Sequence, residues 1–435
     1  DVERAITEVQ CELGMVPAWA AARIVESLQP QAIPLDRVRD HAARSGHLMV
    51  GFLRTFREVC GDAAEHFHLG PTTQDILDTG LTLQMMEATA LVREQALALQ
   101  RTLCHRALAE KNTVMMGRTH EQHALPTTFG LVLATWACEA HDHLDRLDQS
   151  ERRWRFGSVA GGVGAQNAFV ELSDHQTARE LERRVCQRLG LFAPDSQQQG
   201  RFDRFGEVVF ILASLCASLA RMGLQLRTME RPEVAELGTL YGEEACSSST
   251  MPNKRNPEPA ERVQGLADLA RGHADTMLSL RTADHRDSTR IPVLYTAVPG
   301  AFLLVSRALE TIAGHLETMQ VNREVMRANL DHPNVLGQAA AERVMIALYR
   351  KTGRKHWAHT RLSECSAIST RTRRPLRQVI EEMADLTAHL SAAELDLLFE
   401  LSTYTGTAAL QVEQAVACIM ERSGAAREPR GPATA

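Results

Sequence analysis

Residues 208–220 read VVFILASLCASLA, and only Ser214 and Ser218 interrupt the apolar run. A membrane span needs about 20 apolar residues, so this run is too short to be one. A stretch that is apolar on every side is typical of a helix buried at the centre of a helical bundle. The run therefore predicts an all-α fold built around a central helix.

A helical period extends beyond this central run. Apolar residues recur at steps of three and four along a long helix that starts near residue 81, while Arg93, Glu94 and Arg101 lie off that stripe. Aromatic residues make up only 5% of the chain, and no alternating strand pattern of useful length occurs. Further helices are expected at 131–150, 207–230, 259–281 and 298–319. The stripe consists of Leu81, Met85, Ala88, Val92, Ala96, Leu99 and Leu103.

A chain of 435 residues is too long for one compact core. We expect an N-terminal helical domain at 1–80, a central helical bundle at 81–319 and a smaller helical domain at 320–435. Within the bundle, residues 242–259 combine small polar residues with prolines and a glycine, which predicts a loop. The tail from residue 423, SGAAREPRGPATA, is expected to be disordered.

Charge and cysteine usage exclude several classes of protein. The net charge is −6 with both signs interleaved, and no basic stripe could neutralise phosphates, so nucleic acid is not an expected partner. The nine cysteines are scattered without a C-x-x-C pair, which indicates thiols in a reducing compartment. The first residues, DVERAITEVQ, do not resemble a signal peptide. We therefore expect a cytoplasmic protein that does not enter a membrane.

Three polar islands interrupt the apolar pattern: GPTTQD at 70–75, GRTHEQHALPTTFG at 117–130 and CSSSTMPNKRNP at 246–257. The first could be only a helix cap, since Thr and Asp cap helices routinely. The third is less easily explained as a cap, because its serines, Lys254 and Asn256 offer a base or nucleophile, a cation and an amide together. Helix ends can converge in a bundle, and convergent polar groups in an apolar scaffold predict a binding site.

The islands resemble the motifs of the fumarase/aspartase superfamily. CSSSTMPNKRNP resembles the signature loop GSSxMPxKxNP, GPTTQD resembles G-x-T-S-x-D, and GRTHEQHALPTTFG resembles the T-H-x-Q-x-A-x-P box. The resemblance covers nearly the whole chain and is greatest to adenylosuccinate lyase and 3-carboxymuconate cycloisomerase. It implies a three-domain all-α subunit, a homotetramer with a central helical bundle, and active sites that are each built from three chains.

The resemblance also implies the chemistry of the third island. A proton leaves the carbon beside a carboxylate, and a group then leaves the next carbon; the doubly negative aci form must be stabilised as it develops. The family base is a serine six positions before the loop lysine, which here is Ser248 before Lys254. Asn256 would hold a substrate carboxylate. Ser247 stands where the family usually has glycine, which puts the conformation of the loop in question.

Residues of the other two islands receive roles in the same way. His120 matches the histidine that protonates the leaving nitrogen in the adenylosuccinate branch, a task suited to an imidazole at neutral pH. Thr119, Thr72 and Thr73 would bind substrate carboxylates.

Other substrate contacts implied by the resemblance are His47, His68 and Gln198. No cofactor is expected. A zinc site at His66 and His68 is disfavoured, because no third ligand lies at metal spacing.

The stretch after the signature loop bears on the substrate. Adenylosuccinate lyase grips its nucleotide phosphate there with a serine-rich motif that ends in arginine, whereas this chain reads HRDSTRIPVLYTAVPG from His285. By length Tyr295 falls near the phosphate arginine, although Arg290 could replace it if the gap lies elsewhere. A weakened phosphate grip favours a small substituted succinate, and nitrosuccinate is the leading candidate.

Three alternatives to a small-substrate lyase remain open. They are an adenylosuccinate lyase of purine biosynthesis, a 3-carboxy-cis,cis-muconate cycloisomerase, and a non-catalytic relative comparable to the lens crystallins. His47 argues against the cycloisomerase, whose branch usually has an amide at that position. The joint presence of Ser248, Lys254 and His120 argues against a non-catalytic relative.

Overall fold

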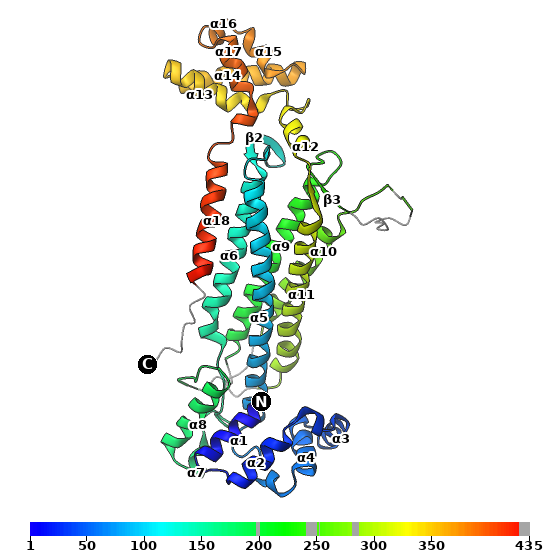
Figure 1. Cartoon of the computed structure of the whole chain (residues 1–435), viewed down its shortest axis with the longest axis vertical. Helices are drawn as coiled ribbons and strands as arrows, with labels where there is room; N and C mark the ends of the chain where they lie inside the picture. Colours follow the sequence, from blue (N-terminus) through cyan, green and yellow to red (C-terminus); the bar gives the residue numbers. More distant parts are fainter. Residues whose placement is uncertain (197–200, 241–249, 252, 281–286, 426–435) are drawn as a thin grey trace. The chain divides into compact units, whose positions relative to one another are not determined.

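The computed structural model describes residues 1–196, 201–240, 250–251, 253–280 and 287–425. Helices dominate these residues, which confirms the all-α prediction, and their strands form two short antiparallel pairs (Figure 1). The chain divides into two compact units. Unit 1 comprises Asp1–Glu94, Asp145–Ser214 and Leu269–Val305, and unit 2 comprises Gln95–Leu144, Leu215–Asp268 and Ser306–Ala435. The three consecutive domains remain a prediction.

Long helices supply segments to both units, because each unit boundary falls within one of them. The expected apolar stripe lies on the first long helix, Thr73–Ala109, and each of its positions except the half-buried Ala88 is buried. Burial of this stripe is the main reason why the segment is helical over so many turns. The long helices are α5 Thr73–Ala109, α6 Phe129–Trp154, α9 Asp203–Met229, α10 Glu258–Leu278 and α11 Arg290–Thr318.

The run VVFILASLCASLA forms the middle of α9, as expected, but it is not covered on every side. Val208, Leu212 and Cys216 are fully buried, whereas Phe210 is 57% exposed. Among the described residues, α9 and α11 are long and apolar enough to cross a membrane by length and composition. Core helices of folded proteins share those properties, and the most apolar window of α9 is 61% buried.

Helix α11 begins at Arg290 and not near Val298, where the sequence placed it. The predicted start lies directly before Pro299, but the helix keeps this proline in its interior. Pro292 lies in the first turn, where the missing N–H group is tolerated. A Cβ on Gly300 would lie 2.5 Å from Nε2 of His273 in α10, so the glycine permits a close approach of these two helices.

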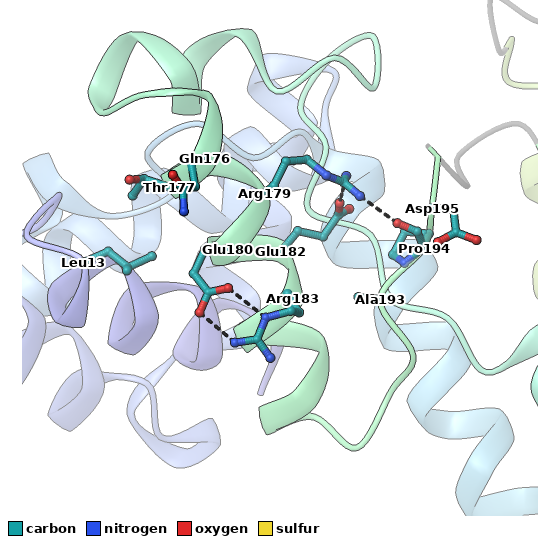
Figure 2. A pocket seen from close by; sticks show the side chains of 10 residues that line it. All are labelled: Leu13, Gln176, Thr177, Arg179, Glu180, Glu182, Arg183, Ala193, Pro194 and Asp195. Atoms are coloured by element: carbon teal, nitrogen blue, oxygen red, sulfur yellow. Dashed lines mark hydrogen bonds and ion pairs between the residues drawn. The ribbon is translucent and has the colours of Figure 1, made fainter. Parts of the chain in front are cut away.

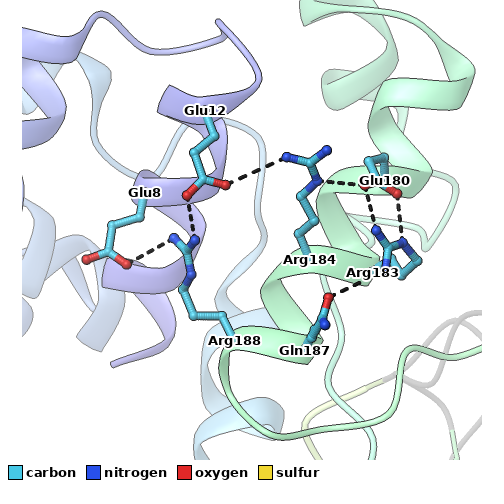
Figure 3. Close-up of polar contacts among 7 residues, drawn as sticks. All are labelled: Glu8, Glu12, Glu180, Arg183, Arg184, Gln187 and Arg188. Atoms are coloured by element: carbon cyan, nitrogen blue, oxygen red, sulfur yellow. Dashed lines mark hydrogen bonds and ion pairs between the residues drawn. The ribbon is translucent and has the colours of Figure 1, made fainter. Parts of the chain in front are cut away.

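Unit 1 adds short helices around two small cores. One core joins α1 and α8 through apolar residues such as Ile6, Val9 and Leu181. Ion pairs border it, since Arg188 contacts Glu8 and Glu12 across the two helices (Figure 3). The short helices are α1 Val2–Glu12, α2 Ala18–Ser27, η1 Pro30–Ala32, α3 Leu35–Ser45, α4 Leu48–Cys60, η2 Gly61–His66, α7 Asn167–Leu172 and α8 His175–Arg188.

Unit 2 contains the strands, β1 Val114–Thr119 with β2 Gln122–Thr128 and β3 Leu237–Thr239 with β4 Met319–Val321. The sequence predicted no strands, because these runs are too short to show a clear alternation. A compact helical core follows, in which Leu348, Leu362 and Val379 are buried together. The elements of unit 2 after β4 are α12 Arg323–Ala328, η3 Asn329–Asp331, η4 Gln338–Ala340, α13 Ala341–Thr352, α14 Lys355–Thr372, α15 Leu376–Glu381, α16 Ala384–Thr387, α17 Ala392–Phe399, η5 Leu401–Thr403 and α18 Ala408–Ala425. The compact core is formed by residues of α13 to α17.

Candidate functional site

The first island, GPTTQD, is a strained turn that leads into α5 in unit 1. Gly70 has φ +101, and a Cβ there would lie 2.6 Å from the ring of Phe169, so only glycine fits. His68 has φ 54, an unusual value for a residue with a side chain. Such strain concentrates at functional sites, because the surrounding structure must enforce it.

The ring of His68 is fixed by an acidic residue of α1. Its Nδ1 lies 2.5 Å from Oε1 of Glu3, and the two side chains are only 13% and 6% exposed. Carboxylates that contact one ring nitrogen of a histidine set its orientation and tautomer. His47 instead lies at the N-cap of α4, where its exposed ring accepts a hydrogen bond from Val50 N–H through Nδ1 at 3.4 Å.

Thr72 directly precedes α5, Thr73 is its first residue, and both are half-buried. Asp75 fixes the turn before α5 through its hydrogen bonds, a role that the sequence did not reveal. Its carboxylate is fully buried and accepts from Thr72 N–H at 3.0 Å, Ser158 Oγ–H at 2.9 Å, and the N–H groups of Ala160 and Gly161. An acidic residue two positions after the threonines was the available signal, but a helix cap explained it equally well.

The second island forms the β1–β2 hairpin in unit 2. Thr119 and Gln122 pair across a two-residue turn made of His120 and Glu121. Both turn residues have positive φ, 54 and 60, as a type I′ turn requires, although neither is the glycine or asparagine that favours this turn. The turn presents Thr119 and His120 as exposed residues.

The third island lies partly outside the described residues, and so do Ser247, Ser248 and Gln198. Lys254 is exposed, and its backbone N–H donates to Met251 O at 3.0 Å. Asn256 is half-buried, and its backbone carbonyl accepts a hydrogen bond from the N–H of Glu258, the first residue of α10. Lys254 and Asn256 therefore precede the N-terminus of a long helix, as the third polar island was expected to do.

In the stretch that would bind a phosphate, the arginine at position 290 is buried. His285 and Arg286 lie outside the described residues, but Arg290 is only 2% exposed, and its guanidinium stacks 4.6 Å from the ring centre of Phe202. Burial, with a smaller contribution from Asp78, raises the pKa of Tyr295 to about 12. The phenol is therefore uncharged at neutral pH, and Arg290 is packed inside unit 1.

Unit 2 has a polar cavity of about 450 Å³ beside the hairpin. Gln122 and His123 from the hairpin line it together with His332, Asn334 and Gln338. The rings of His123 and His332 meet edge to face at 6.1 Å. Burial, followed by the charge of Arg118 and the second imidazole, lowers the pKa of His123 and so favours its neutral ring.

A second cavity, of about 680 Å³, lies against α8 in unit 1 and contains none of the expected site residues (Figure 2). On its wall Arg179 pairs with Glu182, and Arg183 pairs with Glu180. Glu182 is 1% exposed, and burial raises its pKa to about 7. Within the described residues, no group of three or more His, Cys, Asp or Glu side chains could hold a metal ion.

Comparisons with known proteins agree with this arrangement. The sequence model of a lyase family matches residues 18–272, and the model of the adenylosuccinate lyase C-terminus matches residues 337–415. The chain is 32% identical over 417 residues to the N-acetyl-S-(2-succino)cysteine lyase of Dickeya dadantii, covering 96% of this chain and 90% of that one. It is also 32% identical over 418 residues to the adenylosuccinate lyase of Methanothermobacter thermautotrophicus, covering 95% and 92%.

Solved structures show the same fold. The fumarate lyase from Mesorhizobium sp. BNC1 matches with a TM-score of 0.87 at 28% identity, covering 96% of this chain and 93% of that one. The 3-carboxy-cis,cis-muconate lactonizing enzyme from Pseudomonas putida also gives 0.87 at 28%, covering 97% and 94%. The chain therefore belongs to the fumarase/aspartase superfamily of lyases, in the branch that includes adenylosuccinate lyase.

Proposed function

We propose that this lyase eliminates a substituent from a substituted succinate and releases fumarate. The proposal is supported by the family membership and by the exposed pair Thr119 and His120 on a strained turn. Ser248 is the proposed base. It removes the proton beside one carboxylate, the electron pair forms the new double bond, and the substituent leaves the neighbouring carbon.

Other residues of the islands would bind and polarise the substrate. Lys254, an exposed cation, would stabilise the aci-carboxylate as its second negative charge develops. Asn256 and the hydroxyls of Thr72, Thr73 and Thr119 would hold the two carboxylates. The remaining proposed substrate contacts are His47, His68 and Gln198.

The burial of Arg290 is the observation that supports a small substrate without a phosphate. It is the only cation among the described residues 287–305, and it stacks on Phe202 inside unit 1. Tyr295 cannot replace it, because an uncharged phenol does not offset the charge of a phosphate. A substrate without a phosphate needs no such grip, and nitrosuccinate remains our leading candidate because nitrite leaves as a stable anion.

N-acetyl-S-(2-succino)cysteine is a second candidate. A relative that is 32% identical over nearly the whole chain carries the name of this substrate. The compound is also a succinate with a small substituent, and its leaving group is a thiolate. A thiol has a pKa near 8.5, so this group needs more help from an acid than nitrite does and less than an amine does.

We also propose a homotetramer with shared active sites in the cytoplasm. Large apolar side chains stay exposed on the long helices of this single chain, as soluble monomers rarely allow. The cysteines among the described residues are free, which suits a reducing compartment. The most exposed of these apolar residues include Leu91, Phe210, Leu269, Leu278 and Leu303.

The test is an ultraviolet assay with a panel of four compounds, supplied to the wild-type protein and to Ser248→Ala. Nitrosuccinate, N-acetyl-S-(2-succino)cysteine and adenylosuccinate are followed by the fumarate released, and 3-carboxy-cis,cis-muconate, which gives a lactone, is followed by the loss of its diene absorbance. We expect fumarate from one of the first two compounds and none from the variant. Efficient turnover of adenylosuccinate with neither small substrate would refute the proposed substrate class.

A further inference from the structure

Glu236 is fully buried and contacts the turn end of the hairpin that carries Thr119 and His120. Both of its oxygens bind the guanidinium of Arg118, the residue directly before Thr119. Arg118 Nη2 donates to Oε1 at 2.7 Å, and Nη1 donates to Oε2 at 2.9 Å. A bidentate pair of this kind fixes the direction of the arginine as well as its distance.

Glu236 is itself held firmly by the residues around α12. Asn329 donates through Nδ2 to Oε1 of Glu236 at 3.0 Å and to Val234 O at 2.9 Å. On the other side, Asn322 donates from its backbone to Glu236 O and from its side chain to Ala235 O. The carboxylate is therefore a fixed point in unit 2, to which the hairpin is attached through Arg118.

The hairpin needs such an attachment because its own backbone does not favour its shape. The turn residues His120 and Glu121 are both left-handed, and the strand register shifts between Met116 and Arg118. Gly117 lies at that shift, where a Cβ would come within 2.6 Å of Leu125 O. Without an outside anchor, the strand end and the turn could relax to an unstrained form.

We infer that Glu236 is a positioning residue, which acts through Arg118 to hold Thr119 and His120 in the geometry that the reaction uses. The inference rests on the proposed function, since it assigns His120 to the substrate side. Glu236 does not touch substrate. Its effect is the placement of the turn, and a displacement of about 1 Å in such a group can cost about 100-fold in rate.

The test separates positioning from folding with two variants. Glu236→Gln breaks a buried ion pair and should lower both the melting temperature and kcat, the latter by about 10- to 100-fold, with a smaller change in KM. The double variant Arg118→Met/Glu236→Leu removes both buried charges, so its melting temperature should recover while its kcat stays low. Recovery of kcat together with stability would overturn the inference, because the pair would then have only a structural role.

Glu110→Gln provides a matched control. Glu110 is another buried carboxylate of unit 2 that binds an arginine through both oxygens, Arg323, at the end of α5 before β1. Its loss should lower the melting temperature but leave kcat within about twofold of wild type. A loss of kcat equal to that of Glu236→Gln would overturn the inference, because any damage to unit 2 would then have the same effect.

Two further measurements tie the effect to the turn. In a His120→Ala background, Glu236→Gln should cause a smaller loss of kcat than it does in wild type, since only Thr119 is then left to misplace, whereas full additivity would contradict the inference. Hydrogen exchange of residues 114–128 should accelerate in Glu236→Gln with no substrate present, and unchanged exchange would contradict it. Absence of fumarate release by wild type on every compound would refute the proposed function alone, since the exchange measurement needs no turnover.

Discussion

Glu182 is a buried carboxyl that titrates in the neutral range. Burial raises its pKa to about 7, with Asp75 adding to the effect, although Val159 N–H and Arg179 favour the charged form. A carboxyl whose pKa is raised by folding stabilises the folded state below its unfolded pKa, and this contribution is lost as pH rises from about 4.5 to 7. The folded protein should therefore lose on the order of 3 kcal/mol over that range through this group.

Glu182→Gln should abolish this pH dependence, because the amide cannot ionise. The thermal midpoint of wild type should fall relative to that of the variant as pH rises from about 5 to 7.5. Glu180→Gln is the control on the same helix: Arg183 and Arg184 lower the pKa of Glu180 to about 2, so its contribution changes only in acid. Parallel profiles for wild type and Glu182→Gln would show that the carboxyl stays ionised in the folded protein.

The role of His120 depends on the group that leaves. An amine must be protonated as its bond breaks, so with adenylosuccinate His120→Ala should lose about as much rate as Ser248→Ala, on the order of 10²- to 10⁴-fold. Nitrite leaves as a stable anion, and the loss with nitrosuccinate should be far smaller. Fumarate release by wild type, His120→Ala and Ser248→Ala, measured with both compounds, checks this. Equal losses for His120→Ala on both would mean that His120 does more than protonate.

The start of α5 depends on one carboxylate that gathers hydrogen bonds from two segments. Asp75→Asn puts an NH₂ group opposite donors that the carboxylate now accepts, so we expect a loss of about 2–4 kcal/mol in the free energy of unfolding. The Michaelis constant should also rise, because Thr72 and Thr73 belong to the same turn. Denaturant unfolding and steady-state kinetics measure both effects.

Asp174→Asn is the matched control for the change at Asp75. Asp174 caps α8 at an exposed position, where it accepts from Gln176 and Thr177 N–H groups. Asparagine caps helices about as well, so this change should cost less than about 0.5 kcal/mol. If the two variants lose similar stability, Asp75 is an ordinary cap and does not organise the site.

Helices were predictable from the sequence where burial decides them. The stripe from Leu81 to Leu103 and the apolar run in α9 reflect side-chain contacts that follow the helical period. The β1–β2 hairpin was not predictable from the sequence. Its shape depends on partners distant in sequence, such as Glu236, and its turn residues are not those that usually mark a tight turn. The start of α11 was placed too late, directly before Pro299, although the helix contains this proline in its interior.

For the site, the motifs located the islands but could not reveal burial. In the sequence, Tyr295 fell at the place of the phosphate arginine by length, and Arg290 could replace that arginine if the gap lay elsewhere. Only packing shows that the guanidinium of Arg290 is buried and stacked on Phe202. Of the two supporting carboxylates, Asp75 is the last residue of the first island, and Glu236 belongs to none of the three islands. Their importance lies in the number and direction of their hydrogen bonds, which a sequence does not display.

In the whole molecule, the exposed apolar residues of the long helices lead to a prediction about assembly. If each site combines islands from different chains, a mixture of Ser248→Ala and His120→Ala proteins should recover part of the wild-type activity, because some hybrid sites carry neither change. Fumarate release after subunit exchange, with light scattering to follow the oligomer, measures this. A monomer, or no recovery after verified exchange, would contradict shared sites.

The left-handed turn of the hairpin also means that the chain is not at its stability optimum. Glu121 has φ 60, a backbone conformation that glycine adopts without steric cost. Glu121→Gly should therefore raise the free energy of unfolding by about 0.5–1 kcal/mol, and a higher thermal midpoint would show it. A lower midpoint would contradict this expectation. Selection removes only proteins that are too unstable to function, so stabilising substitutions such as Glu121→Gly often remain available in a natural sequence.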